Sequence, residues 1–348
     1  MDTPTAFERY AAWVSEISPL YATITAAVAD DSRLLAIAAE ARAEQPEPEL
    51  LLAAVHSLLL DDEDHPLANL YRSCDGDYPD PAVDPVPVFR DFCLENEDRL
   101  RSLIATRRCQ TNAIGRSAML APAFEHVART AEQRSLAQVE IGASAGLNLN
   151  WDRYQYDMGD AGRFGNSDSP VTISTMVRGD RRPPLAQELP SVAHRCGIDL
   201  NTLDVTDEAD ARWLRALIPP AQDRRHERLE TALDIARENQ PPLKEGDVLD
   251  ELPRQLSDAP TDAELVVFST HVLYQLDDET IAALRALLSD HSSERRVRWL
   301  SIDPNEGLGT PTYRLVTFSD GEATETQLAQ FESYGEWVQW TANTNELV

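Results

Sequence analysis

The residues best suited to chemistry lie in one glycine-rich stretch, Glu140-Ile-Gly-Ala-Ser-Ala-Gly146. Gly142 and Gly146 let a backbone turn sharply and approach a ligand without a Cβ in the way. When such a turn follows a strand and opens a helix, its amides can hold a phosphate or the amino-acid portion of a nucleoside ligand. A glycine-rich turn can also be purely structural, so the stretch predicts a ligand site only together with other residues.

Later residues provide that second signal. Asp199 in CGIDLN and Asp247 in EGDVLD follow two candidate strands. We expect Asp199 to accept hydrogen bonds from ribose hydroxyls and Asp247 to border an adenine ring, although each also fits a solvated acid in an acid-rich chain. The apolar segment LVVFSTHVLYQL then brings Ser269, Thr270 and His271 to the carboxyl edge of the predicted sheet, where ligands bind in open α/β folds. His271 is a candidate general base or a packed histidine.

The same turn also spells G-x-S-x-G, the nucleophile elbow of α/β-hydrolases, with Ser144 as the attacking group. Asp204 or Asp247, followed by His271 or His291, has the chain order that such a triad needs. Hydrolases of that fold place several strands before the elbow, whereas the upstream sequence here has a helical pattern. The hydrolase is therefore the less favoured alternative.

A polar and basic stretch, TRRCQTNAIGR, lies at 106–116 between two predicted helices. Arg107, Arg108, Asn112 and Arg116 are candidate contacts for a small-molecule substrate, because the planar guanidinium suits a carboxylate or phosphate and the stretch therefore favours an anionic or amide-bearing ligand. The alternative is a capped loop whose arginines pair with surface acids.

The elements that must position these residues divide the chain into two predicted domains. From about 5 to 135 the apolar residues recur at helical spacing, which predicts a helical N-terminal cap domain at 1–135 with a proline-rich loop at 75–88. From Leu136 onward apolar strands alternate with helices, which predicts an α/β domain at 136–348 with a Rossmann-like, mostly parallel sheet. The expected strands include 136–141, 171–175, 192–200, 263–276 and 296–303; we expect EATETQLAQF near the C-terminus to form a helix or long turn.

Composition restricts the partners. The formal net charge of −29, with Lys244 as the only lysine, is typical of halophile proteins and argues against a nucleic-acid surface. The longest apolar run is too short to span a membrane, and the N-terminus lacks the pattern of a secretion signal, so we expect a cytoplasmic protein. The four cysteines form no C-x-x-C pair and the seven histidines have no ligand spacing, so we expect no metal.

The segment from about 136 to 340 resembles class I S-adenosylmethionine-dependent methyltransferases. VEIGASAGLNL is similar to their first motif, GDVLDELP to their adenine-contacting acidic loop, and LVVFSTHVLYQLDDETIAALRALL to their fourth strand and the following helix. The whole chain resembles the family numbered 2332 among domains of unknown function, through AVHSLLL, HPLANLY, TRRCQTNAIGR, EIGASAGLNLNWDRY, LDVTDEADARWLRALI and VVFSTHVL.

The methyltransferase resemblance implies S-adenosylmethionine as cofactor and methyl transfer as the reaction. It implies that the turn, Asp199, Asp247 and Ser269 bind the cofactor, and that Thr270 and His271 line the edge where the methyl group is transferred. The cofactor turn comprises Glu140, Gly142, Ser144 and Gly146. Ser144 stands where a middle glycine is common, and an insertion at 151–190 precedes the predicted second strand. A non-catalytic nucleoside-binding or scaffold protein is the remaining alternative.

Overall fold

The structure is a computed structural model that describes residues 2–61, 64–76, 83–110, 112–131, 135–185, 188–305 and 309–342; of residues 304, 305, 309 and 310 only the backbone is described. The chain forms two compact units. Unit 1 combines Met1–Thr111 with Asp204–Glu230, and unit 2 combines Asn112–Leu203 with Thr231–Val348. These cuts do not coincide with the division at residue 135 expected from the sequence, because residues 112–135 belong to unit 2 and 204–230 to unit 1.

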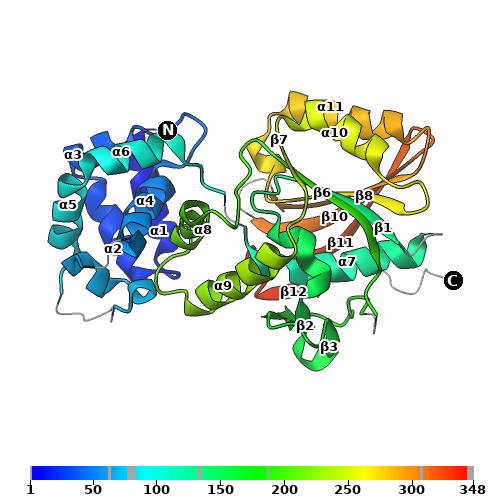
Figure 1. Cartoon of the computed structure of the whole chain (residues 1–348), viewed down its shortest axis with the longest axis horizontal. Helices are drawn as coiled ribbons and strands as arrows, with labels where there is room; N and C mark the ends of the chain where they lie inside the picture. Colours follow the sequence, from blue (N-terminus) through cyan, green and yellow to red (C-terminus); the bar gives the residue numbers. More distant parts are fainter. Residues whose placement is uncertain are drawn as a thin grey trace. The chain divides into compact units, whose positions relative to one another are not determined.

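Unit 1 is helical throughout its described residues (Figure 1). Asp2, Ser18, Asp31 and Asp84 each accept a hydrogen bond from a first-turn amide, which explains where four of the helices begin. The helices are α1 (Thr3–Val14), α2 (Pro19–Val28), α3 (Ser32–Ala38), α4 (Glu47–Asp61), α5 (Pro85–Glu95), α6 (Glu97–Thr106) and α8 (Glu208–Ala216), with 3₁₀ turns η1 (Pro66–Leu70) and η2 (Arg72–Cys74); α9 (Asp223–Glu238) begins in this unit.

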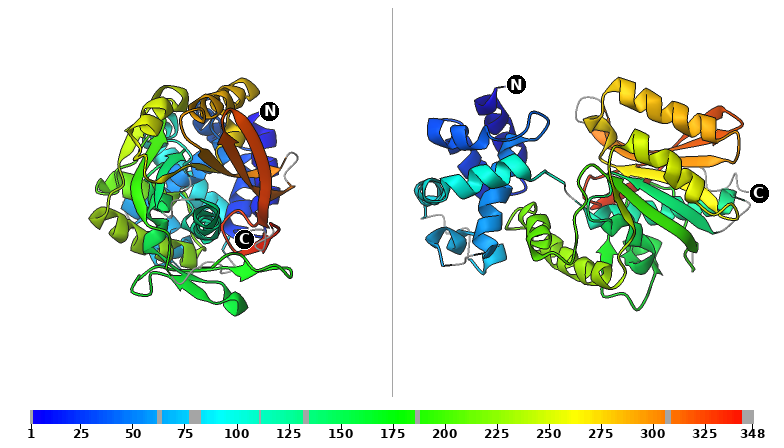
Figure 2. Two further views of the ribbon diagram at one scale, coloured as in Figure 1. Left: turned by 90° about the vertical axis from the view of Figure 1, so that its right-hand side faces the viewer. Right: turned by 45° about the horizontal axis from the view of Figure 1, so that its top comes forward.

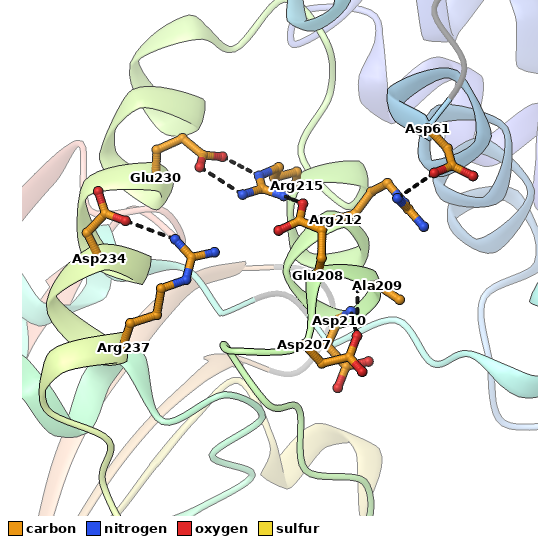
Figure 3. Close-up of polar contacts among 10 residues, drawn as sticks. All are labelled: Asp61, Asp207, Glu208, Ala209, Asp210, Arg212, Arg215, Glu230, Asp234 and Arg237. Carbon is orange, nitrogen blue, oxygen red and sulfur yellow. Dashed lines mark hydrogen bonds and ion pairs between the residues drawn. The ribbon is translucent and has the colours of Figure 1, made fainter.

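Helix α8 joins unit 1 because it buries an apolar face there and carries ion pairs on its other side. Trp213 is buried, and its indole N–H donates to the carbonyl of Arg108 at 2.8 Å. Arg212 pairs with Asp61 at the end of α4 at 2.6 Å (Figure 3). Arg215 bridges Glu208 and Glu230, which ties α8 to the start of α9 (Figure 3).

Unit 2 is built on a nine-stranded sheet with the order β5-β12-β11-β10-β9-β8-β1-β6-β7. The half from β7 to β9 is parallel, and β9, β10, β11 and β12 run antiparallel to their neighbours in turn. The strands are β1 (Leu136–Ile141), β5 (Met176–Val177), β6 (Val192–Asp199), β7 (Leu243–Glu245), β8 (Glu264–Thr270), β9 (Val297–Asn305), β10 (Gly309–Ser319), β11 (Glu322–Phe331) and β12 (Trp337–Trp340).

Helices cover both faces of this sheet. On one face α10 (Val248–Asp258) and α11 (Asp278–His291) pack on the apolar residues of β1, β8 and β9 (Figures 1 and 2). On the other, Phe124 of α7 (Ser117–Thr130) meets Phe268 of β8 with 5.3 Å between ring centroids. Successive residues of a strand point to opposite faces, so Glu140, the register partner of Phe268, lies on the α7 face.

The segment between β1 and β6 forms a small three-stranded sheet of its own. It begins with a 3₁₀ segment η4 (Leu147–Arg153), and includes a further 3₁₀ turn η5 (Gly159–Ala161). The strands, in the order β3-β2-β4, are β2 (Gln155–Asp157), β3 (Arg163–Gly165) and β4 (Thr172–Ser174). The expected strands at 171–175, 192–200 and 296–303 are therefore confirmed in place, although 171–175 belongs to this second sheet. Of the strand expected at 263–276 only Glu264–Thr270 is a strand, and Leu273–Gln275 forms a 3₁₀ turn.

Three expectations about elements were wrong. EATETQLAQF forms strand β11 and not a helix or long turn, because its backbone pairs with β10 and β12 while six of its side chains remain exposed. The expected loop at 75–88 ends earlier, because α5 begins at Pro85 with Asp84 as its cap; residues 77–82 lie outside the described part. The turn after β1 opens into the 3₁₀ segment η4 and not into an α-helix. The chain as a whole is a mixed α/β protein with an all-helical N-terminal part.

Candidate functional site

The glycine turn lies at the carboxyl end of β1, the central strand of the parallel half of the sheet. The amides of Gly142 and Ala143 both donate to the carbonyl of Ile198 on β6, at 2.8 and 3.2 Å. Gly142 and Gly146 have φ of +72°, and Ser144 has φ of +52°. Ser144 thus takes the left-handed conformation that favours glycine.

Packing explains both glycines. A Cβ on Gly142 would lie 2.3 Å from Cγ2 of Val272, and one on Gly146 would lie 2.6 Å from Cγ of Pro241. No side chain fits in either position without a shift of these neighbours. The glycines are therefore required by the protein itself, and they do not by themselves indicate a ligand.

Glu140 is the least expected group at this turn. Its side chain is 1% exposed, and neither carboxylate oxygen has a hydrogen-bond partner within the described part of the chain. Burial raises the pKa of Glu140 well above its ordinary value, and the charge of Asp199 adds to the rise. The side chain of Asn148, which lies close to the carboxyl without forming a hydrogen bond of good geometry, and the charge of Arg116 lower it in part. An unpartnered buried carboxyl is costly, so this group needs either a proton or a ligand.

The two acids expected to contact the nucleoside differ in their surroundings. Asp199, at the end of β6, accepts from the amide of Ser144 at 2.8 Å and from the amide of Asn201 at 2.9 Å. It therefore holds the turn after β1 against the end of β6. Asp247 is exposed and caps α10, accepting from the amide of Leu249 at 2.8 Å. The side chain of Asp247 therefore stabilises the first turn of α10 as its N-cap.

The carboxyl end of β8 brings Ser269, Thr270 and His271 beside the turn. Ser269 pairs in register with Ile141, is fully buried, and its hydroxyl has no partner within the described residues. Thr270 is 5% exposed, and its carbonyl accepts from Arg116 at 3.3 Å.

His271 has a strained backbone and a neutral ring. Its φ is +56°, a conformation that non-glycine residues adopt rarely and mostly at functional sites. Its amide donates to the carbonyl of Ile302 at 2.6 Å, while Nε2 has no partner within the described residues. Burial and the nearby charge of Arg116 lower the pKa of His271 to about 3, so the imidazole is neutral at physiological pH. A neutral ring can accept a hydrogen bond or a proton.

The structure separates the four expected substrate contacts. Asn112 and Arg116 belong to unit 2 and lie beside the turn: the Asn112 amide donates to the carbonyl of Ala143 at 2.8 Å, and Arg116, 6% exposed, donates to the carbonyls of Ser333 and Thr270. Arg107 and Arg108 belong to unit 1. Arg107 pairs with Asp210, and the carbonyl of Arg108 receives the indole N–H of Trp213.

Sequence reasoning missed Asp303, at the carboxyl end of β9. Its Oδ1 accepts from the amides of Val272 and Leu273 at 3.1 and 2.9 Å, while Oδ2 has no partner among the described residues. Burial raises the pKa of Asp303 to about 7, although these amide bonds and the charge of Arg116 act in the opposite direction. The signal that identified Asp199, an acid ending a predicted strand, was also present in RVRWLSID.

The site therefore holds two buried carboxyls, a neutral histidine and one buried guanidinium around the ends of β1, β8 and β9. The charge of Arg116 acts on all three titratable groups, Glu140, His271 and Asp303, which places them close together. This arrangement can bind hydrogen-bond donors and exchange a proton. Within the described residues, no three His, Cys, Asp or Glu side chains are grouped so as to hold a metal ion.

The alternative with Ser144 as a nucleophile has less support from the arrangement of elements. In the described chain only helices precede β1, whereas the hydrolase fold places strands before its elbow. Of the acids and histidines considered for the triad, Asp204 belongs to unit 1, Asp247 caps α10, and His291 is in the last turn of α11.

None of the described helices is long and apolar enough to cross a membrane. No curated protein and no solved structure matches the chain. A family model described as "Uncharacterized protein conserved in bacteria (DUF2332)" matches residues 5–340, nearly the whole length. With its helical unit and its carboxyl-rich sheet edge, the chain therefore belongs to the DUF2332 family.

Proposed function

We propose that this protein is an S-adenosylmethionine-dependent methyltransferase that acts on a small molecule, and that the parallel half of its sheet is Rossmann-like. The observation that carries the proposal is the buried carboxyl of Glu140 at the end of the first strand, which has no hydrogen-bond partner within the described residues. A carboxyl in that position suits the ammonium group of an amino-acid ligand, which would supply the missing hydrogen bonds.

The strand order supports the same conclusion. Numbered along the chain, the parallel strands β7, β6, β1, β8 and β9 have the order 3-2-1-4-5, which agrees with the order of a Rossmann-type sheet. The order reverses at β1, and ligands of open α/β sheets bind outside the carboxyl ends of the strands at such a reversal. Glu140, Asp199 and Ser269 all lie at or near these strand ends.

The chain's own residues have separate tasks in this proposal. The sulfonium of the cofactor supplies an activated methyl group, and the protein contributes mainly alignment. Glu140 binds the ammonium group on the α7 face, whereas Ser269, the register partner of Ile141, lies on the opposite face and binds a polar group at the strand end. Asp199 binds ribose hydroxyls. Neutral His271, with Thr270 beside it, faces the acceptor and can accept a hydrogen bond from it, since burial lowers the pKa of the ring to about 3.

The experiment is isothermal titration of the full chain with S-adenosylmethionine and with S-adenosylhomocysteine. It is run in molar potassium chloride and in dilute buffer, because a net charge of −29 makes folding sensitive to salt. We expect saturable binding of both compounds, and an affinity at least about tenfold lower in Glu140→Gln, since a charged partner of the ammonium is lost. Glu322→Gln, at an exposed position on β11, is the matched control.

Absence of binding to the folded protein in both salts, or equal affinity in wild type and Glu140→Gln, would refute the proposal. A serine-reactive fluorophosphonate tests the hydrolase alternative in parallel. Labelling that Ser144→Ala abolishes would favour that alternative.

A further inference from the structure

The polar atoms without partners at the carboxyl ends of β1, β8 and β9 are mainly hydrogen-bond acceptors. Oδ1 of Asn112, both carboxylate oxygens of Glu140 and Oδ2 of Asp303 are buried and have no partner within the described residues. The Ser269 hydroxyl and Nε2 of His271, also without partners, can act as donor or acceptor. A ligand that satisfies this set must present N–H or O–H donors.

Several of the donors in the same place are already used by the protein. The Asn112 amide group donates to the carbonyl of Ala143, and the Ser144 amide donates to Asp199. Arg116 donates through Nε to the carbonyl of Ser333 at 3.0 Å and through Nη1 to that of Thr270 at 3.3 Å. The guanidinium thereby links the loop after β11 to the end of β8. These two bonds reduce its capacity to bind an anionic ligand, the role expected for Arg116 from the sequence.

Asp303 is the acceptor best placed for a second ligand beside the cofactor turn. Its strand neighbour Ile302 pairs with Thr270, and His271 donates its amide to the same Ile302. One oxygen of Asp303 holds the amides that begin the 3₁₀ turn η6 (Leu273–Gln275). The other oxygen has no partner within the described residues, and a buried carboxylate oxygen without one is unfavourable unless a donor or cation reaches it.

The surroundings of Asp303 also have an aromatic part. The ring of Phe331 lies edge-on to His271 at 6.2 Å, and that of Tyr274 at 6.3 Å between centroids. Tyr274 is 61% exposed, unusual for a large side chain that packs near a partly buried histidine. An amine on an apolar carbon skeleton matches both features of this edge, because its amino group can donate to the unsatisfied acceptors and its skeleton can pack against the aromatic rings.

We propose that the methyl acceptor is a small amine and that Oδ2 of Asp303 binds its amino group. The bound ammonium passes one proton to the Asp303 carboxylate; the freed nitrogen lone pair then forms the N–C bond to the methyl group as the carbon–sulfur bond of the sulfonium breaks, and the neutral thioether leaves. This inference rests on the proposed function, and it replaces an anionic ligand with a cationic one because the unsatisfied atoms are acceptors. Glu140 is reserved for the cofactor, so the two buried carboxyls bind two different amino groups.

The test uses three probes of similar shape: phenethylamine, 2-phenylethanol and 3-phenylpropionate. Each is titrated into the full chain saturated with S-adenosylhomocysteine, and again without it. We expect the amine to bind at least about tenfold more tightly than either other probe, as for a buried charge pair. This comparison needs no variant.

Asp303→Asn then identifies the residue. Asparagine keeps Oδ1 for the amides of Val272 and Leu273 but replaces Oδ2 with a donor, so the preference for the amine should fall at least about tenfold. Asp277→Asn is the matched control, because exposed Asp277 also accepts from a backbone amide, that of Thr280.

Any one of four results would overturn the inference. These are tighter binding of the carboxylate, equal binding of the three probes, absence of binding, and an unchanged preference for the amine in Asp303→Asn. An error in the proposed function would give a different result. If S-adenosylhomocysteine fails to bind while the amine still binds through Asp303, the methyltransferase proposal is wrong and the amine site stands.

Discussion

Asp303→Asn also has a defined effect on stability, which can be measured without any ligand. In the wild type, one oxygen of Asp303 accepts two backbone amides and the other is buried without a partner within the described residues. Asparagine keeps the first arrangement and cannot ionise. The substitution therefore removes the burial of a charge while the turn after β8 stays in place.

The magnitude follows from the pKa of Asp303, which burial raises from 3.8 to about 7. The difference of roughly 3 units, at about 1.4 kcal/mol per unit, corresponds to about 4 kcal/mol. Between these two pH values the folded state holds a proton that the unfolded state has released, so the wild type loses stability as pH rises. Relative to wild type, Asp303→Asn should gain up to about 4 kcal/mol between pH 4 and pH 7 and no more above that range.

The assay is denaturant unfolding of both proteins at intervals from pH 4 to pH 8 at constant salt, followed by tryptophan fluorescence. Asp277→Asn, whose exposed carboxyl has a lowered pKa because it accepts hydrogen bonds from Thr280, serves as the control and should show no gain. A difference between Asp303→Asn and wild type that stays constant over this pH range would refute the reasoning, because it would show that Asp303 titrates alike in both states.

Three further substitutions test other contacts. Gly142→Ala should lower the free energy of unfolding by about 2 kcal/mol, because the new Cβ meets Val272 at positive φ; Val272→Ala in the same chain should restore part of it, and no loss in thermal unfolding would contradict this. Glu264→Gln should cost about 3 kcal/mol in denaturant unfolding, because it leaves buried Arg298 without its charged partner; a change below about 1 kcal/mol would show that the charge is solvated. Asp247→Ser should keep the cap of α10 and its stability within about 0.5 kcal/mol, while affinity for S-adenosylhomocysteine falls about fivefold; unchanged affinity in the titration would remove Asp247 from the cofactor site.

The buried strands of the sheet could be predicted because their side chains are apolar on both faces. Strands β1 and β8 are continuous buried runs, and each ends at a recognisable turn. β11 could not be found this way, because its first six residues are exposed and rich in Glu and Thr, so neither alternation nor an apolar run is visible. Its position depends on pairing with β10, which is fixed by a tight turn containing Asp320 and Gly321 at positive φ.

The sequence predicted part of the candidate site for the same reason. Glu140 and His271 were found because they end the two most apolar strands, and the carboxyl ends of parallel strands share one edge. The burial of Glu140 without a partner was not predictable, since it depends on which helix covers that face. Arg107 was grouped with Arg116 by proximity in sequence, but the two belong to different units and their separate partners follow only from the tertiary structure.

The division of unit 1 between two stretches of chain has a consequence for biosynthesis. Helix α8, with buried Trp213 and the carbonyl that accepts from His56, comes from residues after 203. When only the first 200 residues have left the ribosome, the side of α4 that α8 later covers is still exposed to solvent. The N-terminal helices therefore form an incomplete bundle until over half of the polypeptide has emerged from the ribosome.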